Sequence, residues 1–412
     1  MSKTISLKKV AKYSDARIPI KNVTIDNFVT TDNLLQNKLG ITKATSLPPQ
    51  DGNMPAYFKN DILVGNIRPY LKKIWIADRD GGNSADVLTI QVNEKHNPKF
   101  IYYALYRNDF FEHMMKGSKG TKMPRGDKNQ IMDFSIPDIS LENEEKIANV
   151  LSSLDSKIEL NNKINKELEA MAKTLYDYWF VQFDFPDENG KPYKSSGGKM
   201  VYSQELKREI PEGWEVDELK NLISIERGIS YKSSDITDMG IPMVNLNSFY
   251  LDGTYKPEGI KYFNSAYNNN KIVKAGDLII ATTDVTRNAD IIGKATLIPD
   301  IYNSDIILSC DIAKINCKDS LNKYFLEKLF NSDFYHNYIK GFASGTLVLH
   351  LNTNGIDWYK TFIPPNNLLI KFSNILAPIQ RKKELITLEN QELAKLRDWL
   401  LPMLMNGQVR VK

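Results

Sequence analysis

Two long stretches of the chain carry apolar residues in alternating three- and four-residue steps, the spacing of helices that pack along a narrow seam. The first stretch places Leu151, Leu154, Ile158, Leu168, Ala172, Leu175 and Trp179 on this seam, with Asn161 and Asn165 at the two remaining positions. The second places Leu376, Ile379, Lys383, Ile386, Asn390, Leu393, Arg397 and Leu400 there. Ser140 can cap the first helix, which is predicted over residues 141 to about 181.

The two seams bury each other most simply if the helices pair antiparallel. Asn165 and Asn390 then occupy the same seam position. A buried Asn at such a position costs stability but can fix the register of the pair. The alternative is a polar gap that faces solvent on one side of an amphipathic helix.

The rest of the chain reads as mixed α/β structure with many loops. Short β-branched and aromatic runs bounded by Gly, Asn and Asp predict strands at 74–76, 87–90, 278–280 and 306–308. Short helices are expected at 100–115 and 324–339, each followed by a Gly-containing loop.

The chain also repeats itself. Asp61-Ile-Leu-Val64 resembles Asp277-Leu-Ile-Ile280 at an offset of 216, and Asp109 and Asp333 are 224 apart. In the predicted long helices the offset holds at 225, as for Lys146 and Lys371. A period this long is too large for a solenoid unit and indicates two copies of a globular domain plus a long helix. The predicted fold class is therefore mixed α/β, with two α/β domains joined by two long helices in an antiparallel coiled coil and an internal pseudo-two-fold repeat.

Composition narrows the class further. The 412 residues are 42% apolar and 25% charged, which is ordinary for a globular protein. No transmembrane run or signal peptide is expected. With two cysteines and four histidines in the sequence, we expect no structural zinc site. The low cysteine content also favours the cytoplasm. Residues 1–137 carry 21 Lys and Arg against 13 Asp and Glu, whereas residues 188–366 carry 20 against 22. Only the first block has the charge expected for a polyanion partner.

No catalytic pattern accounts for the chain. Dinucleotide-binding, phosphate-binding and methyltransferase loops are all missing from the sequence. A nuclease-like pattern of Asp187, Glu205 and Lys207 does occur, but it borders a Gly- and Ser-rich stretch that reads as a linker. We therefore interpret the chain as a recognition protein and expect no metal ligands in it.

Three motifs in order resemble one family across the whole chain. Glu145-Lys-Ile-Ala-Asn-Val-Leu-Ser-Ser-Leu-Asp155 with Leu175-Tyr-Asp-Tyr-Trp179 resembles the central conserved region of type I restriction-modification specificity subunits. Ile210-Pro-Glu-Gly-Trp214 resembles the start of their second recognition domain, and Leu396-Arg-Asp-Trp-Leu-Leu-Pro402 their distal conserved region.

This resemblance implies a non-catalytic subunit that recognises double-stranded DNA. It implies target recognition domain 1 at 1–138, a central helix at 139–185, a linker and target recognition domain 2 at 186–366, and a distal helix at 367–412. Each domain would read half of a bipartite site, while the helices set the spacer and dock two methyltransferase subunits. Motor-nuclease subunits would join through these. The chain itself would hold no cofactor, since S-adenosylmethionine, ATP and magnesium belong to partner subunits, and no membrane partner is implied.

Candidate DNA contacts in the first domain lie in two loops. Base readout calls for forked donors and amides, whereas phosphates take Lys, Arg and hydroxyl groups. The first loop follows a predicted strand and holds Asn66, Arg68, Tyr70, Lys72 and Lys73, with Arg68 as the best base-reading candidate. The second is rich in glycine and holds Lys119, Thr121, Lys122 and Arg125. The competing interpretation of the second loop is an exposed, solvated turn.

The second domain offers hydroxyl and amide groups in the matching loops instead of basic ones. The candidates are Thr282, Thr283, Arg287 and Asn288 in one loop, Ser344, Thr346, His350 and Asn352 in the other, and Tyr231, Lys232, Ser233, Asn245 and Asn247 upstream.

Two other functions remain open from the residues alone. One is a self-contained nuclease that uses Asp187, Glu205 and Lys207, which metal-dependent cleavage by the chain alone would reveal. The other is a structural scaffold whose globular ends bind protein.

Overall fold

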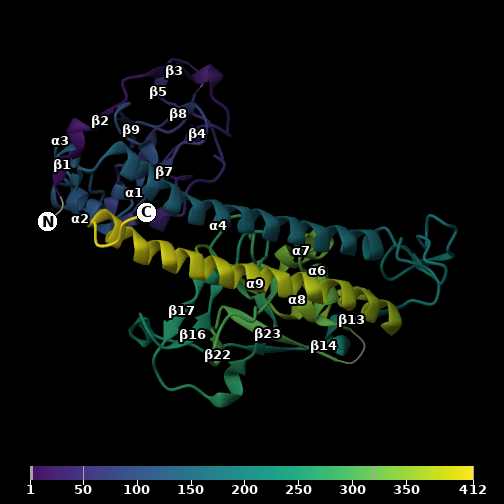
Figure 1. Ribbon diagram of the computed structural model, residues 1–412. Helices are drawn as coiled ribbons and strands as arrows, with labels where there is room; N and C mark the ends of the chain where they lie inside the picture. The colour runs from purple at the N-terminus through teal and green to yellow at the C-terminus, as the bar shows by residue number, and fades with distance from the viewer. Residues whose placement is uncertain (1–2, 50, 319–320, 412) are drawn as a thin grey trace. The chain divides into compact units, whose positions relative to one another are not determined.

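The computed structural model describes residues 3–49, 51–318 and 321–411 and divides into two compact units (Figure 1). Unit 1 consists of residues 1–160 and 390–412, and unit 2 of residues 161–389. Each unit therefore contains a globular part and one half of each long helix. This division cuts across the four segments expected from the sequence, whose bounds stay a prediction.

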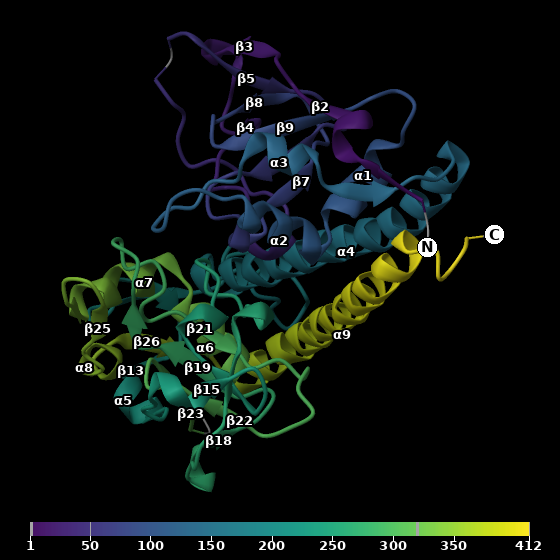
Figure 2. The ribbon, with the colours of Figure 1, turned by 90° about the vertical axis from the view of Figure 1, so that its left-hand side faces the viewer.

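The core of unit 1 is a four-stranded antiparallel sheet with strand order β2 (Ala11–Tyr13), β9 (Val87–Val92), β6 (Ile62–Gly65), β7 (Ile74–Ile76). A second sheet runs β3 (Arg17–Pro19), β5 (Asn53–Tyr57), β8 (Gly81–Asn83), β4 (Phe28–Val29). β1 (Thr4–Ser6) pairs with β10 (Ser135–Pro137). Within unit 1, helices α1 (Pro98–Leu105) and α2 (Asn108–Lys116) lie between these strands and α4, and α3 (Lys128–Met132) follows (Figure 2).

Unit 2 repeats this plan. Its four-stranded sheet runs β14 (Ile223–Arg227), β23 (Ile312–Cys317), β19 (Leu278–Ala281), β21 (Ala295–Leu297). The five-stranded sheet runs β15 (Ile236–Thr237), β17 (Lys261–Phe263), β16 (Ile241–Val244), β22 (Ile306–Leu308), β18 (Ile272–Val273). The parallel pair β16–β22 corresponds to β4–β8 in unit 1. Likewise, β13 (Glu215–Glu218) pairs with β26 (Lys360–Ile363), as β1 does with β10.

The remaining elements of unit 2 surround these sheets. β11 (Met200–Ser203) and β12 (Arg208–Pro211) form a hairpin. β20 (Thr283–Asp284), β25 (Leu349–Leu351) and β24 (Ala343–Ser344) form a three-stranded sheet. The helices are α5 (Leu219–Leu222), α6 (Lys323–Phe330), α7 (Asp333–Ile339) and α8 (Asn354–Asp357). All four predicted strands are present, and the internal repeat is confirmed by the matching strand orders of the two four-stranded core sheets.

The short helices expected at 100–115 and 324–339 are each two helices, which corrects the prediction. In unit 1 the chain is extended at Arg107, between α1 and α2. In unit 2 it is extended at Ser332, whose hydroxyl accepts a hydrogen bond from the Tyr335 amide and so starts α7. A side chain that satisfies a free amide in this way favours a new helix start over continuation.

The two long helices are α4 (Leu141–Tyr176) and α9 (Asn366–Met405). Every predicted seam residue on both helices is buried or half-buried. In unit 1 Asp155 of α4 meets Arg397 of α9 at 2.8 Å, and in unit 2 Glu169 meets Lys383. Higher numbers on one helix thus face lower numbers on the other, which confirms the antiparallel pairing. The first helix ends at Tyr176 rather than 181, because residues 177–181 form a wider π-helical turn that buries Trp179 and Phe180.

A charged network fixes each globular part to its half of the helix pair. In unit 2 the almost fully buried Lys328 of α6 contacts Glu169 of α4 at 2.5 Å and Glu327 at 3.3 Å, and Glu169 also contacts Lys383. Burial alone would raise the pKa of the Glu169 carboxyl, but the two ammonium groups outweigh it and lower the pKa from 4.5 to about 2.

The network of unit 1 is centred on Asp155 of α4. The Tyr103 hydroxyl donates to its carboxylate at 2.6 Å, and Arg397 contacts the other carboxylate oxygen. The Arg397 guanidinium also lies 4.9 Å from the centre of the Tyr106 ring. Since neither side chain of the ion pair is fully exposed, this network orients α1 on the helices.

Candidate DNA interface

The two loops predicted in the first domain lie side by side in unit 1. Ile67 and Arg125 form an antiparallel bridge, and so do Lys119 and Arg125 within the second loop. The Arg68 amide donates to the Pro124 carbonyl at 2.7 Å, and the Gly126 amide donates to the Asn66 carbonyl at 3.2 Å. The second loop is therefore a hairpin, and the first loop pairs with it to give a small three-stranded arrangement. We call this arrangement hairpin 1 (residues 66–73 and 117–126).

Hairpin 1 carries most of its charge in exposed side chains. Lys119, Thr121, Lys122, Arg125 and Tyr70 are exposed, whereas Asn66, Arg68, Lys72 and Lys73 are half-buried. Arg125 pairs with Asp86 at 2.9 Å and Lys119 with Asp127 at 3.7 Å. The Asp127 carboxylate accepts hydrogen bonds from the backbone amides of Gln130 and Asn129. These bonds lower the pKa of the Asp127 carboxyl and also cap the start of α3. The surface is basic and hydroxyl-bearing, as phosphate contacts require.

The remaining basic side chains of the first loop are held by neutral partners. Lys72 donates to the Asn108 side-chain oxygen at 3.0 Å, and Lys73 donates to the Thr31 carbonyl. Neither of these bonds pairs the ammonium group with an acid.

Strain and unmet hydrogen bonds gather at the start of the first loop. Arg68 and Lys72 are both left-handed, with φ of 51°, a conformation that non-glycine residues adopt at a cost. The Arg68 Nε and the Asn66 Oδ1 are buried and have no hydrogen-bond partner among the described residues. Such strained or unsatisfied groups cluster at functional sites, so both observations support Arg68 as the base-reading candidate.

Unit 2 contains the same arrangement in the β20–β25–β24 sheet. Thr283 pairs with His350, and Ser344 pairs with His350. These residues lie 216 and 225 positions after Ile67, Arg125 and Lys119, the offsets at which the sequence repeats. The Leu351 amide donates to the Thr282 carbonyl at 2.9 Å, as the Gly126 amide does to Asn66. We call this element hairpin 2 (residues 282–288 and 343–351).

The chemistry of the two hairpins differs at matching positions. Asp284 stands where unit 1 has Arg68, and its buried carboxylate accepts hydrogen bonds from the amides of Thr286, Ile291 and Ile292 at 2.6 to 3.0 Å. The carboxylate thus shapes the loop from within. The polar side chains left exposed on hairpin 2 and directly after it are Arg287, Asn288, Ser344, Thr346, His350 and Asn352.

Three of the predicted contacts are buried in the folded chain. Thr282 and Thr283 are inside unit 2, where the Thr283 hydroxyl donates to Asp311 at 3.0 Å. Asn245 is also buried, and its amide donates to the Gly259 carbonyl at 2.8 Å while its oxygen accepts from the Asn247 amide. The Asn245 oxygen caps a local turn and the Thr283 hydroxyl bonds within unit 2, uses of Asn and Thr that sequence pattern does not separate from ligand binding.

The upstream candidates belong to a different part of unit 2 from hairpin 2. Tyr231 is half-buried against the five-stranded sheet and lies 3.4 Å from Lys261 Nζ. Lys232, Ser233 and Asn247 are exposed. The structure therefore brings the two repeated loops together in each unit but does not show this third set joining them.

The nuclease alternative gains nothing from the fold. The Asp187 carboxylate accepts hydrogen bonds from the amides of Asn189 and Lys191, and Glu205 pairs with Lys360 at 2.8 Å. Across residues 3–49, 51–318 and 321–411, no three His, Cys, Asp or Glu side chains gather closely enough to hold a metal ion. In that same part of the chain no helix is long and apolar enough to cross a membrane.

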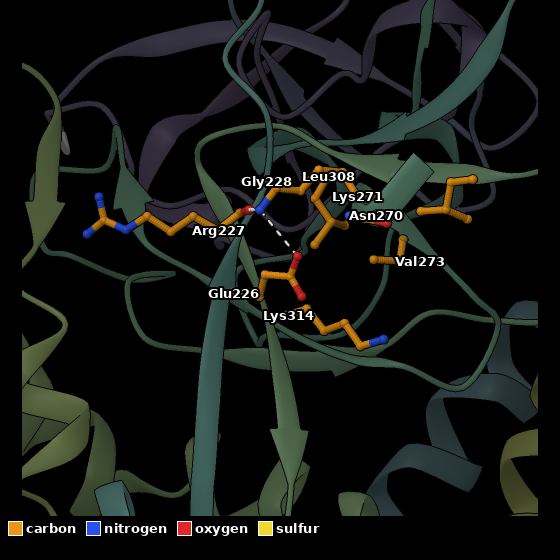
Figure 3. Close-up of a pocket in the computed structure, with 9 residues that line it drawn as sticks. Glu226, Arg227, Gly228, Asn270, Lys271, Val273, Leu308 and Lys314 are labelled. Carbon is orange, nitrogen blue, oxygen red and sulfur yellow. Dashed lines mark hydrogen bonds and ion pairs between the residues drawn. The ribbon is translucent and has the colours of Figure 1, made fainter. Parts of the chain in front are cut away.

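Two hollows in unit 2 are separate from hairpin 2. Figure 3 shows a crevice of about 10 Å³ where Lys271 already bonds to Glu226 at 3.2 Å, too small for more than one water. The other is a cavity of about 350 Å³ lined largely by aromatic rings, with Arg208 in its wall. None of the predicted DNA contacts lines either hollow.

Known proteins share this architecture. Residues 2–170 match the family model of the type I restriction modification DNA specificity domain. The chain is 27% identical over 330 residues to the type I restriction enzyme MjaIX specificity subunit of Methanocaldococcus jannaschii, covering 76% of this chain and 69% of that one. It is 25% identical over 450 aligned positions to the HindI specificity subunit of Haemophilus influenzae, covering 93% and 94%.

A solved structure agrees on the fold. The type I restriction-modification S subunit of M. genitalium superposes with a TM-score of 0.52 at 15% identity, covering 98% of this chain and 96% of that one. The match of residues 2–170 and these relatives support a role in DNA specificity, and the solved structure supports the fold. The chain is thus similar to the specificity subunits of type I restriction-modification systems, and its residues 2–170 match their DNA specificity domain.

Proposed function

We propose that hairpin 1 and hairpin 2 each contact one half of a bipartite DNA target. The observation that carries the proposal is the repeated hydrogen-bond register, which gives both units the same protruding element with different side chains. One scaffold with two chemistries suits a site whose halves differ in sequence. Exposed Arg and Asn side chains supply the donors and acceptors that base edges require.

The long helices would set the spacer between the half-sites and dock two methyltransferase subunits, through which motor-nuclease subunits join. Exposed apolar side chains support a protein partner on both helices. They include Leu160 and Met171 on α4, and Leu385, Leu396 and Trp399 on α9. Isolated helices in water rarely expose so many large apolar groups without a partner. S-adenosylmethionine, ATP and magnesium would be bound by these partner subunits.

Methylome sequencing tests the recognition role. The chain would be expressed with its neighbouring methyltransferase in a host free of DNA methylation. A bipartite motif modified on both strands is the expected result and would name both half-sites. If no motif is modified although the methyltransferase is present and active on another specificity subunit, the proposal fails and a protein-binding scaffold becomes the better explanation.

The electrostatic contribution to DNA binding should differ between hairpin 1 and hairpin 2. Hairpin 1 exposes Lys119 and Lys122, whereas residues 343–352 of hairpin 2 and its flank contain no Lys or Arg. Each phosphate contact contributes about 0.9 to the slope of log K against log salt. Reversing the charge of Lys119 and Lys122 together should therefore weaken DNA binding and flatten its salt dependence by about 2, more than removing Lys232. Equal salt slopes for the two variants would contradict this assignment.

A further inference from the structure

The end of hairpin 2 exposes three aliphatic side chains. Leu347 is 88% exposed, Val285 63% and Val348 39%. Asp284 pairs with Leu349 in antiparallel register, and Val285 and Val348 are the neighbours of this pair at the end of the ladder. We call these three residues the apolar tip. In the repeat, Met123 of hairpin 1 stands 225 positions before Val348 and is also exposed, at 51%.

The apolar tip is held in a defined shape. Asp284 directly precedes Val285, and its carboxylate accepts hydrogen bonds from three backbone amides that follow Val285 in the chain. On the other side Gly345 has φ of +139°, and a Cβ there would lie 2.0 Å from the Val348 carbonyl oxygen. Single exposed aliphatic side chains are ordinary on protein surfaces, but three on one constrained hairpin end form a patch that a partner is expected to cover.

Charge and position narrow the choice of that partner. Around the apolar tip lie the exposed polar side chains of Arg287, Asn288, Ser344 and Thr346, on the hairpin that repeats the basic hairpin 1. Aliphatic groups can accept or donate no hydrogen bond, so they contribute nothing to phosphate binding. In the major groove the one apolar group on a base edge is the 5-methyl of thymine.

We propose that the apolar tip packs against the 5-methyl group of a thymine in the half-site bound by unit 2. This inference rests on the proposed function and adds to it the base feature read by Val285, Leu347 and Val348. Hairpin 2 then compensates for its lack of lysines by burying apolar surface, whereas hairpin 1 relies on charge. Reading a methyl group separates thymine from cytosine at that position without a hydrogen bond.

A double-mutant cycle between protein and DNA tests the contact. The assembled complex with its methyltransferase subunits is titrated with duplexes in which each thymine of the half-site is replaced in turn by deoxyuridine, which removes only the methyl. Burying a methyl-sized group contributes about 0.8 kcal/mol, and 1.4 kcal/mol corresponds to a tenfold change in affinity. For the wild type, one replacement should therefore weaken binding roughly fourfold. With Leu347→Ala the same replacement should have almost no effect, because the contact is already lost.

The control is Met239→Ala, which removes a side chain that is 80% exposed in the same unit but outside the hairpin. This variant should keep the full sensitivity to deoxyuridine. If every replacement weakens the wild type and Leu347→Ala equally, the proposal is wrong. If Leu347→Ala instead weakens assembly with the methyltransferase while all replacements are silent, the tip contacts protein, which also overturns it. A wild-type complex with no sequence preference at all would refute the proposed function itself, before the cycle begins.

Discussion

Replacing Glu169 by Gln should destabilise unit 2 by a predictable amount. Glu169 is 23% exposed and contacts both Lys328 of α6 and Lys383 of α9. Its pKa falls from 4.5 to about 2 in the folded protein, and each pKa unit corresponds to 1.36 kcal/mol. The carboxylate therefore contributes about 3 kcal/mol at neutral pH. Breaking a buried ion pair costs a similar amount, about 3 to 5 kcal/mol.

Hydrogen exchange resolved by peptide measures this effect without requiring the whole chain to unfold in one step. The amides of α6 should exchange about a hundredfold faster in Glu169→Gln at neutral pH, since 1.4 kcal/mol is a factor of ten. The matched control is Glu167→Gln, which changes an exposed acid on the same helix. Similar exchange rates in the two variants would show that the network does not hold α6 on α4 and would refute the reasoning.

The stabilisation that Glu169 contributes should depend on pH. Because the folded-state pKa of Glu169 lies below the unfolded value, its stabilisation is complete above pH 4.5 and is lost as the pH falls through about 2. The difference in free energy of unfolding between wild type and Glu169→Gln should therefore be constant from neutral pH to about 4.5 and shrink below it. A difference that grows on acidification would have the wrong sign.

Two further predictions concern the hairpins. Arg68→Ala and Arg287→Ala should each relax sequence preference by about 1 to 3 kcal/mol in one half-site and leave the other half-site intact. Binding to libraries of DNA sites measures this preference. If either variant loses recognition of both half-sites, the two units do not act as independent modules. Gly345→Ala should distort hairpin 2 and weaken recognition of its half-site, because the new Cβ meets the Val348 carbonyl, whereas Gly341→Ala has open space and should bind DNA like the wild type. Equal binding by both glycine variants would show that the shape of hairpin 2 is unimportant.

The sequence was sufficient for the features that depend on local pattern. A three-four apolar spacing can be satisfied only by a helix, so α4, α9 and their seam follow from it, down to Asn161, which is buried and donates to Glu389 at 2.8 Å. The repeat at 216 and 225 positions likewise predicted which loops of the two units correspond. Since related sequences adopt related folds, the strand orders of the two core sheets β2-β9-β6-β7 and β14-β23-β19-β21 and the registers of the two hairpins match.

Tertiary structure decided what the individual side chains do. Thr283 and Asn245 resemble readers of DNA in the sequence, but their partners Asp311 and Gly259 are contributed by distant segments and bury them. Leu347 is apolar, yet in the folded chain it lies at the exposed end of the hairpin after the Gly345 turn. Periodicity is a property of neighbours along the chain, whereas burial and hydrogen bonding depend on residues that meet only after folding. The sequence therefore determined the architecture and its repeat, and the folded structure selected which residues remain available to contact DNA.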